Sequence, residues 1–484
     1  MSHASVTHNV TVMPGDGVGS ECVAAVRRII AAAGVSIAWE ECEAGGVVFR
    51  KGISSGVPRE TIDSIARTRV ALKGPLETPV GYGERSANVT LRKLFELYGN
   101  IRPTRELPGV QAPFAGRQVD FVVVRENVED LYAGIEHMQT PGVAQCLKLM
   151  SRKGCEKVIR LAFEMARAEG RHRVHCATKS NIMKLTEGLM KRTFEEVARE
   201  YPDLQSEHII IDNCAHQMVR YPEQFDVIVT SNLNGDIISD LAAGLVGGLG
   251  LAPSANIGND VAMFEAVHGS APTIAGKNIV NPTALLLSAV MMLRHLGEFE
   301  AAATIENSVI FTIELGKTLT PDLTDPDHAA STTQFTDKVI EHFGRKSDHW
   351  KARHYHALNP PRVSPRSDYV QVKSRSIAGV DIFVESPLDA GALGESVTAL
   401  LADSPLRLTS ISNRGAVVYP SSDARVDCVD HWRCRLMPRG NTREATDAQI
   451  AEALARIATK HAWVHIEKLQ AFDGVNAWAA DAGE

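Results

Sequence analysis

The sequence predicts an α/β unit that extends to Gly344, followed by a smaller α+β domain. From Val10 onward, apolar runs that end in polar residues alternate with amphipathic helix patterns, and this alternation is typical of α/β proteins. The alternation stops in residues 345–375. A second series of patterns then follows in the order βαββαβ, which is the order of ferredoxin-like domains.

The expected strands of the first unit are apolar runs closed by polar residues. The clearest of these runs are VTVMPGDG, VDFVVVREN, HRVHCATKSN, EHIIIDNCA and FDVIVTSNLNGD. The segments SECVAAVRRIIAAAG, GCEKVIRLAFEMARAEG and EGLMKRTFEEVAREY have the apolar spacing of helices. Functional groups of an α/β sheet gather at the carboxyl ends of its strands, so the polar closing residues are the first candidates for a site.

Size and composition exclude several classes of protein. A chain of 484 residues is long for one core, so we expect two or three domains. A net charge of −7 argues against a nucleic-acid-binding protein, which needs a basic face. We expect no signal peptide at the N-terminus, and the apolar stretch Ala284–Leu293 is too short to span a membrane. The eight cysteines contain no CxxC pair, which favours reduced thiols and a cytoplasmic location.

The expected C-terminal domain covers residues 376–484. Its strands are predicted at GVDIFVE, at LRLTSIS with AVVYP, at DCVDHWRCRL and at AWVHIEKL, and its helices at ALGESVTALLAD and TDAQIAEALARIATK. Thr446 and Gln449 have the spacing of a capping box at the start of the second helix. Residues 345–375 are rich in Pro, His and basic residues without an apolar period. We interpret them as a solvated linker, in preference to a segment that contacts nucleic acid.

Several arginines fall within a short part of the first unit, some of them at the ends of expected strands. Guanidinium groups bind carboxylates through two parallel hydrogen bonds, so such a cluster suits a small di- or tricarboxylate. The alternative is a set of surface arginines with ordinary ion pairs, and spacing alone does not decide between them. The cluster contains Arg85, Arg92, Arg102 and Arg125, with Ser86 and Asn88 among them.

Two acidic residues in NLNGDIISD point to a cation site. Asp236 and Asp240 are four residues apart, which places both carboxylates on one face of a helix, where like charges repel. A hard divalent cation such as Mg²⁺ would compensate them, and Asp212 at the end of HIIID is a third candidate ligand. The alternative is an aspartate favoured by the helix dipole next to an exposed neighbour.

Two further residues could transfer protons. Lys179 closes the run VHCATK, and Tyr132 follows RENVEDL. Lysine and tyrosine act as bases or acids when burial or neighbouring charges shift their pKa. The alternative for each is a partly buried amphipathic side chain.

The motif PGDGVG, residues 14–19, could be mistaken for a phosphate-binding loop. It has neither the GxGxxG spacing nor the Lys-Ser/Thr ending of a P-loop. We interpret it as a glycine turn, so the sequence does not predict a standard Rossmann dinucleotide site.

Together these pieces resemble a known family, the isocitrate/isopropylmalate dehydrogenases, which oxidise and decarboxylate 2-hydroxy acids. The motifs that carry the resemblance run from Val10 to Gly344. They are PGDGVG, GPLETPVG, SANVTLR, IRP, RENVEDLYAGIE, KSNIMKLTEG, NLNGDIISD, ANIG and HGSAP. Over its whole length the chain is similar to the long homodimeric isocitrate dehydrogenases of Thermus and rickettsial type, which carry an extra C-terminal domain.

The resemblance implies an isopropylmalate dehydrogenase-like fold, with a large and a small α/β domain around a cleft. Residues 1–97 and 247–344 would form the large domain on the coenzyme side. Residues 98–246 would form the small domain, with a dimer clasp near residues 131–149. The linker and the ferredoxin-like domain would follow.

The resemblance also implies the substrate. Isocitrate enzymes of this family place a Ser-x-Asn pair before the first arginine, as Ser86 and Asn88 stand here, whereas isopropylmalate enzymes have an apolar residue in that region. We therefore expect isocitrate. Homoisocitrate or a substrate of the tartrate or malate type is the second alternative, and isopropylmalate is the third. By the same resemblance, the substrate carboxylates would be held by Arg92, Arg102 and Arg125.

The catalytic roles follow from the same resemblance. Tyr132 would protonate the enol after decarboxylation, and Lys179 would help to remove the 2-hydroxyl proton. The metal, Mg²⁺ or Mn²⁺, would be bound by Asp236 and Asp240 together with Asp212. In the family the lysine and the Asp212-type aspartate reach across from the other subunit, so we expect a homodimer with shared active sites.

The resemblance assigns HGSAP to the adenosine part of the coenzyme. The family's NADP enzymes usually follow this motif with Lys-Tyr and its NAD enzymes with Asp-Ile, whereas this chain has Thr273 and Ile274. The lysine that meets the 2′-phosphate is missing, so we predict a preference for NAD⁺, with NADP⁺ as the alternative. The residues implied in coenzyme binding are Thr78, His268, Gly269, Ser270, Ala271, Thr273, Ile274 and Asn281.

Two alternatives concern larger parts of the chain. A relative that has lost catalysis is disfavoured, because the acid, base and metal-ligand candidates are all present. The C-terminal domain has no catalytic constellation, so we expect it to extend the dimer interface rather than to bind an effector. We expect neither nucleic acid nor a membrane as a partner.

Overall fold

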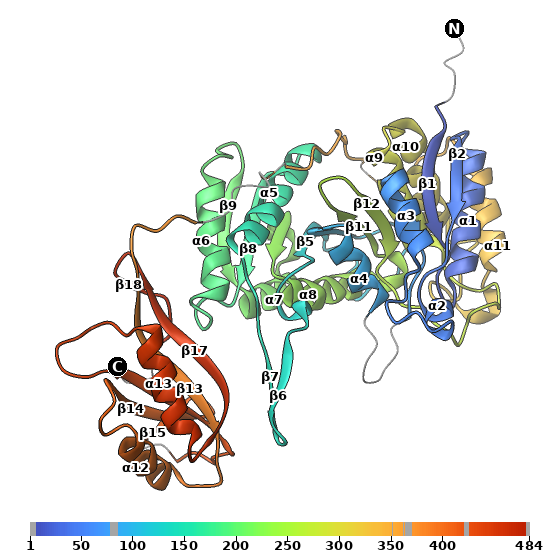
Figure 1. The fold of residues 1–484 in the computed structure, drawn as a ribbon. Helices are drawn as coiled ribbons and strands as arrows, with labels where there is room; N and C mark the ends of the chain where they lie inside the picture. The colour runs from blue at the N-terminus through green and yellow to red at the C-terminus, as the bar shows by residue number, and fades with distance from the viewer. Residues whose placement is uncertain are drawn as a thin grey trace. The chain divides into compact units, whose positions relative to one another are not determined.

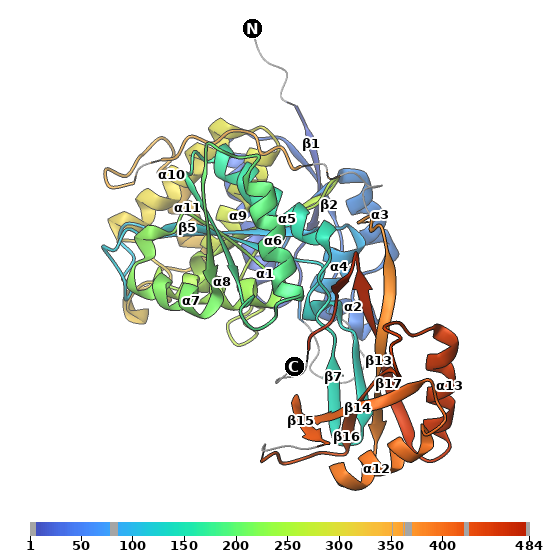
Figure 2. The same ribbon diagram turned by 90° about the vertical axis from the view of Figure 1, so that its left-hand side faces the viewer.

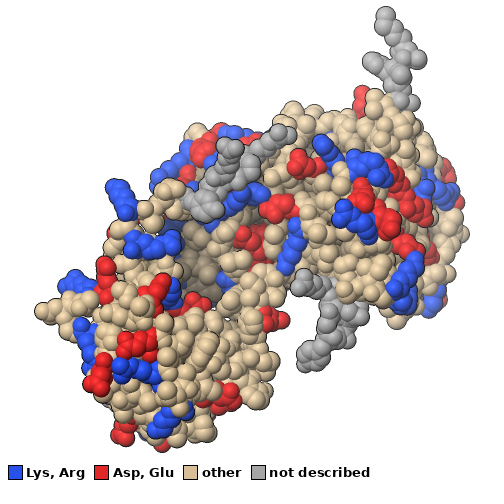
Figure 3. Space-filling model, viewed as in Figure 1, with Lys and Arg blue, Asp and Glu red and all other residues tan. Residues whose placement is uncertain are grey.

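The computed structural model describes residues 6–77, 86–350, 352–361, 363, 370–420 and 425–480. The chain divides into two compact units. Unit 1 contains residues 1–133 and 148–363, and unit 2 contains residues 134–147 and 364–484. The described residues contain no helix that is both long and apolar enough to cross a membrane. Acidic and basic side chains are interspersed on the face that Figure 3 shows.

The described residues of unit 1 form a ten-stranded sheet with the strand order β2-β1-β3-β12-β11-β4-β5-β10-β8-β9 (Figure 1). The strands are β1 (His8–Met13), β2 (Ile37–Glu41), β3 (Val70–Lys73), β4 (Gly99–Arg105), β5 (Asp120–Glu126), β8 (Arg173–Thr178), β9 (Gln205–Ile210), β10 (Val227–Thr230), β11 (Pro253–Ile257) and β12 (Ala262–Ala266). The strands from β2 to β12 in this order are parallel, and so are those from β5 to β9. The antiparallel strands β11 and β4 join the two parallel halves.

Helices cover both halves of this sheet, as an α/β pattern predicts. The longer ones are α1 (Gly19–Ala32), α3 (Arg59–Thr68), α5 (Arg152–Ala168), α6 (Thr186–Ala198), α7 (Ile211–Arg220), α8 (Asn232–Leu245), α9 (Thr283–His295), α10 (Phe299–Leu315) and α11 (Thr332–Glu341). The shorter ones are α2 (Gly46–Arg50) and α4 (Ala87–Leu94). The central helix α9 contains the apolar stretch Ala284–Leu293 and packs against β11 and β12 with most of its side chains buried.

Unit 2 combines a hairpin with the C-terminal domain. The hairpin strands β6 (Glu136–Thr140) and β7 (Val143–Cys146) lie in the region expected as a dimer clasp. They lie beside the C-terminal sheet, where β6 contacts β17 (Figure 2). The Thr140 hydroxyl is 2.9 Å from a carboxylate oxygen of Asp430, to which it donates a hydrogen bond.

The described C-terminal residues form an antiparallel sheet with the order β15-β14-β16-β13-β17-β18. Its elements are β13 (Arg375–Glu385), α12 (Ala390–Leu400), β14 (Leu406–Asn413), β15 (Ala416–Tyr419), β16 (His431–Pro438), α13 (Asp447–Ala458), β17 (Ala462–Phe472) and β18 (Val475–Asn476). The predicted βαββαβ order is confirmed, with β15 as a separate short strand and β18 added at the edge. The predicted capping box of Thr446 and Gln449 at the start of α13 is also present.

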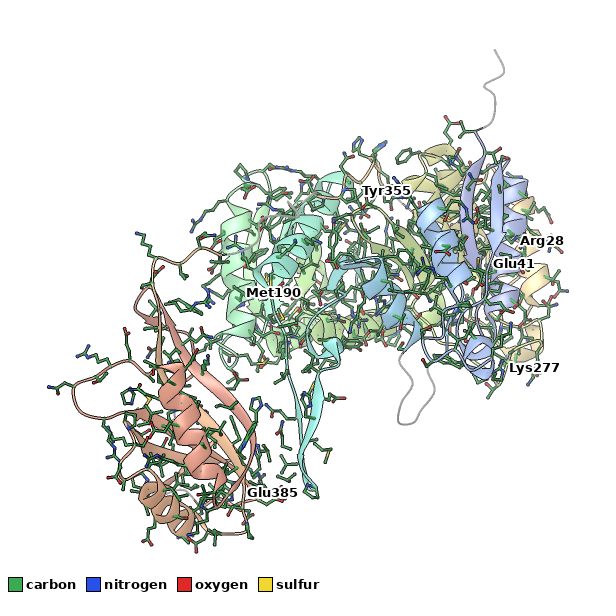
Figure 4. All side chains as sticks on the ribbon, in the orientation of Figure 1. Arg28, Glu41, Met190, Lys277, Tyr355 and Glu385 are labelled. Carbon is green, nitrogen blue, oxygen red and sulfur yellow. The ribbon has the colours of Figure 1, made fainter. Side chains whose placement is uncertain are left out.

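Residues 346–350 and 352–361, which we call the strap, differ from the solvated linker expected from the sequence. The ring of Trp350 packs against the guanidinium of Arg105 in β4, with 3.4 Å between the Arg105 Cζ and the ring centroid. The ring of Tyr355, which is labelled in Figure 4, packs in the same way against Arg294 in α9, also at 3.4 Å. The backbone amide of His356 donates to the Ala168 carbonyl at the end of α5. The strap is held by single aromatic rings that stack on arginines of other elements, not by a regularly spaced apolar face. Its sequence therefore shows no apolar periodicity.

We expect Trp350→Ala to lower the free energy of unfolding by about 1–3 kcal/mol, because it removes buried ring area and a cation–π contact. A solvated linker would show no such loss. Chemical denaturation of the full chain measures it, with Tyr221→Ala as the matched control. Tyr221 is an exposed ring with Arg220 5.2 Å from its centroid, and its replacement should change stability by about 0.5 kcal/mol or less.

Candidate active site

A pocket of about 120 Å³ opens in unit 1 where β3, β4, β11 and β12 meet. Its lining brings two of the sequence-predicted arginines, Arg92 and Arg102, next to Asn88 and to His268 and Gly269 of the HGSAP motif. The other lining residues are Lys73, Pro75, Leu76, Ser254, Glu265, Ala266 and Val267. Two of the predicted carboxylate-binding arginines and two of the predicted coenzyme-binding residues therefore share one pocket.

Arg92 is held by a buried acid that sequence reasoning missed. Its Nη2 donates to Oε1 of Glu265 at 3.0 Å, while Lys73 pairs with the other carboxylate oxygen. Burial alone would raise the pKa of Glu265, but Lys73 and Arg92 hold it far below its usual range. Glu265 is therefore ionised, and it fixes one edge of the Arg92 guanidinium. The buried Nε of Arg92 has no hydrogen-bond partner within the described chain.

Arg102 and Arg125 lie beside the two aspartates of NLNGDIISD. Arg102 Nη1 is 3.4 Å from Oδ1 of Asp236 and 3.5 Å from Oδ1 of Asp240. Arg125 pairs with the same oxygen of Asp236, and its Nε and Nη2 donate to Asn232 at 3.0 and 2.8 Å. Both arginines lie close enough to reduce the repulsion between the two carboxylates.

The close approach of α8 to Arg125 depends on the glycine of NLNGD. A Cβ atom built at Gly235 would lie 2.6 Å from Cγ of Arg125, closer than real side chains come. Any other residue would push α8, and with it the Asp236 carboxylate, away from the arginine.

Tyr132 donates from its hydroxyl to Oδ2 of Asp236 at 2.6 Å. Burial raises the pKa of Tyr132, and the Asp236 carboxylate raises it further, so the phenol keeps its proton at neutral pH. Burial would also raise the pKa of Asp236, but Arg125, the Tyr132 hydroxyl and Arg102 lower it. Burial and the neighbouring arginines lower the pKa of Arg125 to about 9, which leaves it charged at neutral pH.

Lys179 and Asp212 form a pair of their own. The Lys179 ammonium donates to Oδ1 of Asp212 at 2.9 Å, and this contact lowers the pKa of Asp212. Asp212 lies in the first turn of α7 rather than at the end of β9. Within the described part of the chain, no three His, Cys, Asp or Glu side chains are grouped to hold a metal ion, so Asp212 does not join Asp236 and Asp240.

The Ser-x-Asn pair stands at the start of α4. Ser86 is the residue that precedes the helix, and Asn88 donates to the Leu76 carbonyl at 3.5 Å, a long hydrogen bond. The side-chain amide oxygen Oδ1 of Asn88 is buried without a hydrogen-bond partner in the described structure. Thr78 and Arg85 lie outside the described residues.

The HGSAP loop is held by the PGDGVG turn. The Val18 amide donates to the Ser270 carbonyl at 2.9 Å, and a Cβ at Gly17 would lie 1.9 Å from the same oxygen. Gly17 has φ of +59°, a conformation that favours glycine. The turn therefore positions the HGSAP loop.

The remaining loop residues differ in exposure. Thr273 is exposed and Ile274 packs partly against the core, close to the exposed Lys277 that Figure 4 labels. Ala271 has φ of +41°, and Ile274 donates its amide to the Ala271 carbonyl. Asn281 is buried, where it donates to Asp322 at 2.9 Å and accepts from the Thr283 amide at 3.0 Å.

Comparisons with known proteins agree along the whole chain. Residues 9–339 match the isocitrate/isopropylmalate dehydrogenase family, and residues 375–484 match the family described as bacterial isocitrate dehydrogenase, C-terminal domain. The isocitrate dehydrogenase [NADP] of Thermus thermophilus is 58% identical, covering 98% of this chain and 96% of its own length. That of Rickettsia bellii is 40% identical over 98% of this chain and 99% of its own. A crystal structure of a Thermus thermophilus protein superposes with a TM-score of 0.95 at 58% identity, over 98% of this chain and 96% of that one.

Proposed function

The chain belongs to the isocitrate/isopropylmalate dehydrogenase family and is an isocitrate dehydrogenase, and we propose that it uses NADP⁺ and a divalent metal ion at the pocket described above. The reaction converts isocitrate to 2-oxoglutarate and CO₂. The observation that supports this site best is the pocket in which Arg92 and Arg102 meet the HGSAP loop.

The three arginines are proposed to bind the substrate carboxylates. Arg92 and Arg102 line the pocket, and Arg125 lies next to Arg102 through their shared partner Asp236. Arg92 is held by Glu265 through Nη2, whereas Arg125 already donates from Nε, Nη1 and Nη2 to Asn232 and Asp236. A substrate contact with Arg125 would therefore use the second N–H of its Nη groups. Ser86 and Asn88 are the proposed contacts for the additional carboxylate that isocitrate has and isopropylmalate lacks.

Tyr132 is the proposed general acid and Lys179 the proposed partner in removal of the 2-hydroxyl proton. The raised pKa of Tyr132 keeps its proton available at neutral pH for transfer to a carbanion-like carbon. Its hydrogen bond to Asp236 fixes the direction in which the hydroxyl points.

Asp236 and Asp240 are the proposed metal ligands on this chain. Their carboxylate oxygens suit Mg²⁺ or Mn²⁺, and Mg²⁺ sites commonly take one or two protein carboxylates and complete the shell with water and substrate. When bound, the ion would act as a Lewis acid at the 2-oxo group and stabilise the charge released by decarboxylation. Asp212 is proposed to contribute from a second subunit.

The proposed dimer rests on exposed apolar side chains next to these residues. Ile182 and Leu185 follow Lys179, Ile237 follows Asp236, and their exposed fractions are 69%, 44% and 61%. Apolar side chains of this size at a site are typical of a surface that another chain covers. We therefore propose a homodimer with shared sites, in which the hairpin β6–β7 is the dimer clasp and the C-terminal domain extends the interface.

The domain limits expected from the sequence become part of this proposal. The antiparallel joint of β11 and β4 lies close to the proposed boundaries between large and small domains, at residues 97–98 and 246–247. A cytoplasmic location stays a prediction.

The coenzyme is the part of the proposal that departs from our sequence-based preference. Thr273 and Ile274 supply no charge for a 2′-phosphate, which led to the prediction of NAD⁺. The near-full-length relatives in Thermus thermophilus and Rickettsia bellii carry NADP in their names, and this favours the alternative. We propose NADP⁺, held by the loop from His268 to Ile274 and by Asn281.

Kinetics with both coenzymes test this proposal. We expect isocitrate oxidation with Mg²⁺ to show a higher kcat/KM for NADP⁺ than for NAD⁺. If kcat/KM for NADP⁺ is lower than kcat/KM for NAD⁺, the coenzyme is NAD⁺, as the sequence predicted. Absence of isocitrate turnover would contradict the function itself.

A variant defines what Thr273 and Ile274 contribute. We expect Thr273→Lys with Ile274→Tyr to raise the NADP⁺ to NAD⁺ ratio by about 10- to 100-fold, because a charge-assisted phosphate contact contributes about 1.5–3 kcal/mol. Thr459→Lys adds the same charge to the C-terminal domain and should leave the ratio unchanged. An unchanged ratio in the double variant would show that the 2′ position lies elsewhere.

A further inference from the structure

A buried chain of amide side chains connects Arg102 to Arg92. Arg102 Nε donates to Oδ1 of Asn100 at 2.7 Å, and Nδ2 of Asn100 donates to Oδ1 of Asn256 at 2.6 Å. Nδ2 of Asn256 then donates to Oε1 of Glu265 at 2.8 Å. The same Glu265 oxygen accepts from Arg92 at 3.0 Å, so the chain of hydrogen bonds, which we call the relay, ends at the second arginine.

This relay lies where the two parallel halves of the sheet join. Asn100 on β4 and Asn256 on β11 face each other directly in the antiparallel ladder, and both side chains are fully buried. Glu265 lies on β12, which pairs with the other side of β11. The distance between the two arginines is thus set across the joint by side chains, in addition to the backbone ladder.

The orientation of both amides is determined by the ends of the relay. A guanidinium can only donate, so the Asn100 oxygen must face Arg102. The ionised Glu265 can only accept, so the Asn256 nitrogen must face Glu265. The remaining nitrogen of Asn100 and oxygen of Asn256 then match each other, and reversing either amide would break a contact.

We infer that Asn256, acting with Asn100, is a positioning residue that fixes the spacing of Arg92 and Arg102 for the carboxylates of isocitrate. Neither asparagine lines the pocket. The inference rests on the proposed substrate role of these two arginines. It predicts that the relay affects substrate binding and leaves coenzyme binding unaffected.

Replacing either amide by the isosteric acid breaks the relay with little change in volume. In Asn100→Asp the new carboxylate could accept from Arg102 but could not donate to Asn256. In Asn256→Asp a second carboxyl would lie against Glu265. We expect each variant to raise the KM for isocitrate by about 10- to 100-fold, the range for leaving a buried hydrogen-bonding group without its partner. The KM for coenzyme should change by about 2-fold or less, since no relay residue belongs to the HGSAP loop.

The matched control is Asn413→Ala in the C-terminal domain. Asn413 is equally buried and makes three hydrogen bonds, to the carbonyls of Val429 and His431 and from the Val429 amide. Its loss should lower the thermal midpoint without raising the KM for isocitrate. A purely structural role for Asn256 would give the same pattern as this control.

The pH profile of Asn256→Asp is a second readout. The charged groups linked to position 256 by these contacts are Glu265, with Lys73 and Arg92 paired to its carboxylate, and Arg102 beyond Asn100. Two adjacent buried carboxyls raise the pKa of one of them. Once protonated, the new carboxyl at position 256 can donate to Glu265 as the amide did. The ratio of variant to wild-type KM for isocitrate should therefore fall as the pH is lowered, and the control should show no such recovery.

The outcomes separate this inference from the proposed function. Failure of the wild-type enzyme to turn over isocitrate would remove the function and the inference together. Normal wild-type turnover with an unchanged isocitrate KM in folded Asn256→Asp and Asn100→Asp would overturn the relay alone. If one variant does not fold, the other tests the same relay from the opposite strand.

Discussion

Replacing Asp236 by Asn is expected to reduce kcat for isocitrate by about 10³-fold or more, because a metal ligand and the partner of a general acid are lost together. One carboxylate pairs with Arg125, lies 3.4 Å from Arg102 and accepts the Tyr132 hydroxyl at 2.6 Å. No other described acid touches all three of these proposed substrate and catalytic residues. The amide would keep the shape of the side chain but remove its charge.

The measurement is kcat as a function of Mg²⁺ concentration. Asp236→Asn should raise the Mg²⁺ concentration needed for half-maximal activity as well as lower kcat. Asp240→Asn should have a smaller effect on kcat, since Asp240 is more exposed and, among the site residues that the structure describes, pairs with Arg102 alone. Asp337→Asn removes an exposed ion pair with Arg28 and serves as the control with unchanged kinetics. A kcat within about tenfold of wild type in Asp236→Asn would show that this carboxylate is not at the reaction centre.

The sequence could predict that the polar residues after apolar runs lie together, because the carboxyl ends of parallel strands meet at one edge of the sheet. Arg125 lies near the end of β5, and Asp236 lies in α8, the helix that follows the neighbouring parallel strand β10, so both are delivered to one edge of the sheet. Their contact in the structure agrees with that argument. The residues that hold them were not predictable in the same way. Glu265, Asn100 and Asn256 lie inside strands, where a lone polar residue among apolar neighbours gives no periodic signal.

For Glu265, however, the sequence does contain a signal. Glu265 interrupts the apolar run VAMF–AV, and a charged residue inside a buried strand requires a partner of opposite charge. That partner is Lys73, which ends the run VALK. The sequence cannot show which two interior charges meet, because the pairing depends on the strand order β3-β12, and this order does not follow the order along the chain.

The strap illustrates a different limit. Its arginine–aromatic contacts join residues far apart in the chain, such as Arg105 with Trp350 and Arg294 with Tyr355. Local composition shows only prolines, histidines and basic residues, which are equally typical of a solvated segment. The contact between hairpin β6–β7 and β17 was also beyond local patterns, because it joins elements over 300 residues apart.

The pairing of Lys179 with Asp212, apart from Asp236 and Asp240, leads to the second large prediction. We expect Lys179→Met and Asp236→Asn each to be nearly inactive as a homodimer, yet to regain activity when the two chains are mixed. If Lys179 acts on the site of the other subunit, a hybrid dimer has one site with Asp236 from one chain and Lys179 from its partner. Random pairing makes about half of the dimers hybrid, each with one intact site, so activity should return to about one quarter of wild type.

The control uses two defects on the same side of the proposed shared site. Lys179→Met mixed with Asp212→Asn should recover no activity, because in every hybrid site one of the two residues supplied from the partner is defective. Coexpression of differently tagged chains, followed by purification of the hybrid, measures both mixtures without unfolding the protein. The purified hybrid of the first mixture should have about half of the wild-type activity, because one of its two sites is intact. Recovery in neither mixture would place Lys179 in the same subunit's site. Recovery in both would separate the roles of Lys179 and Asp212, and only recovery confined to the first mixture supports a site built by two chains.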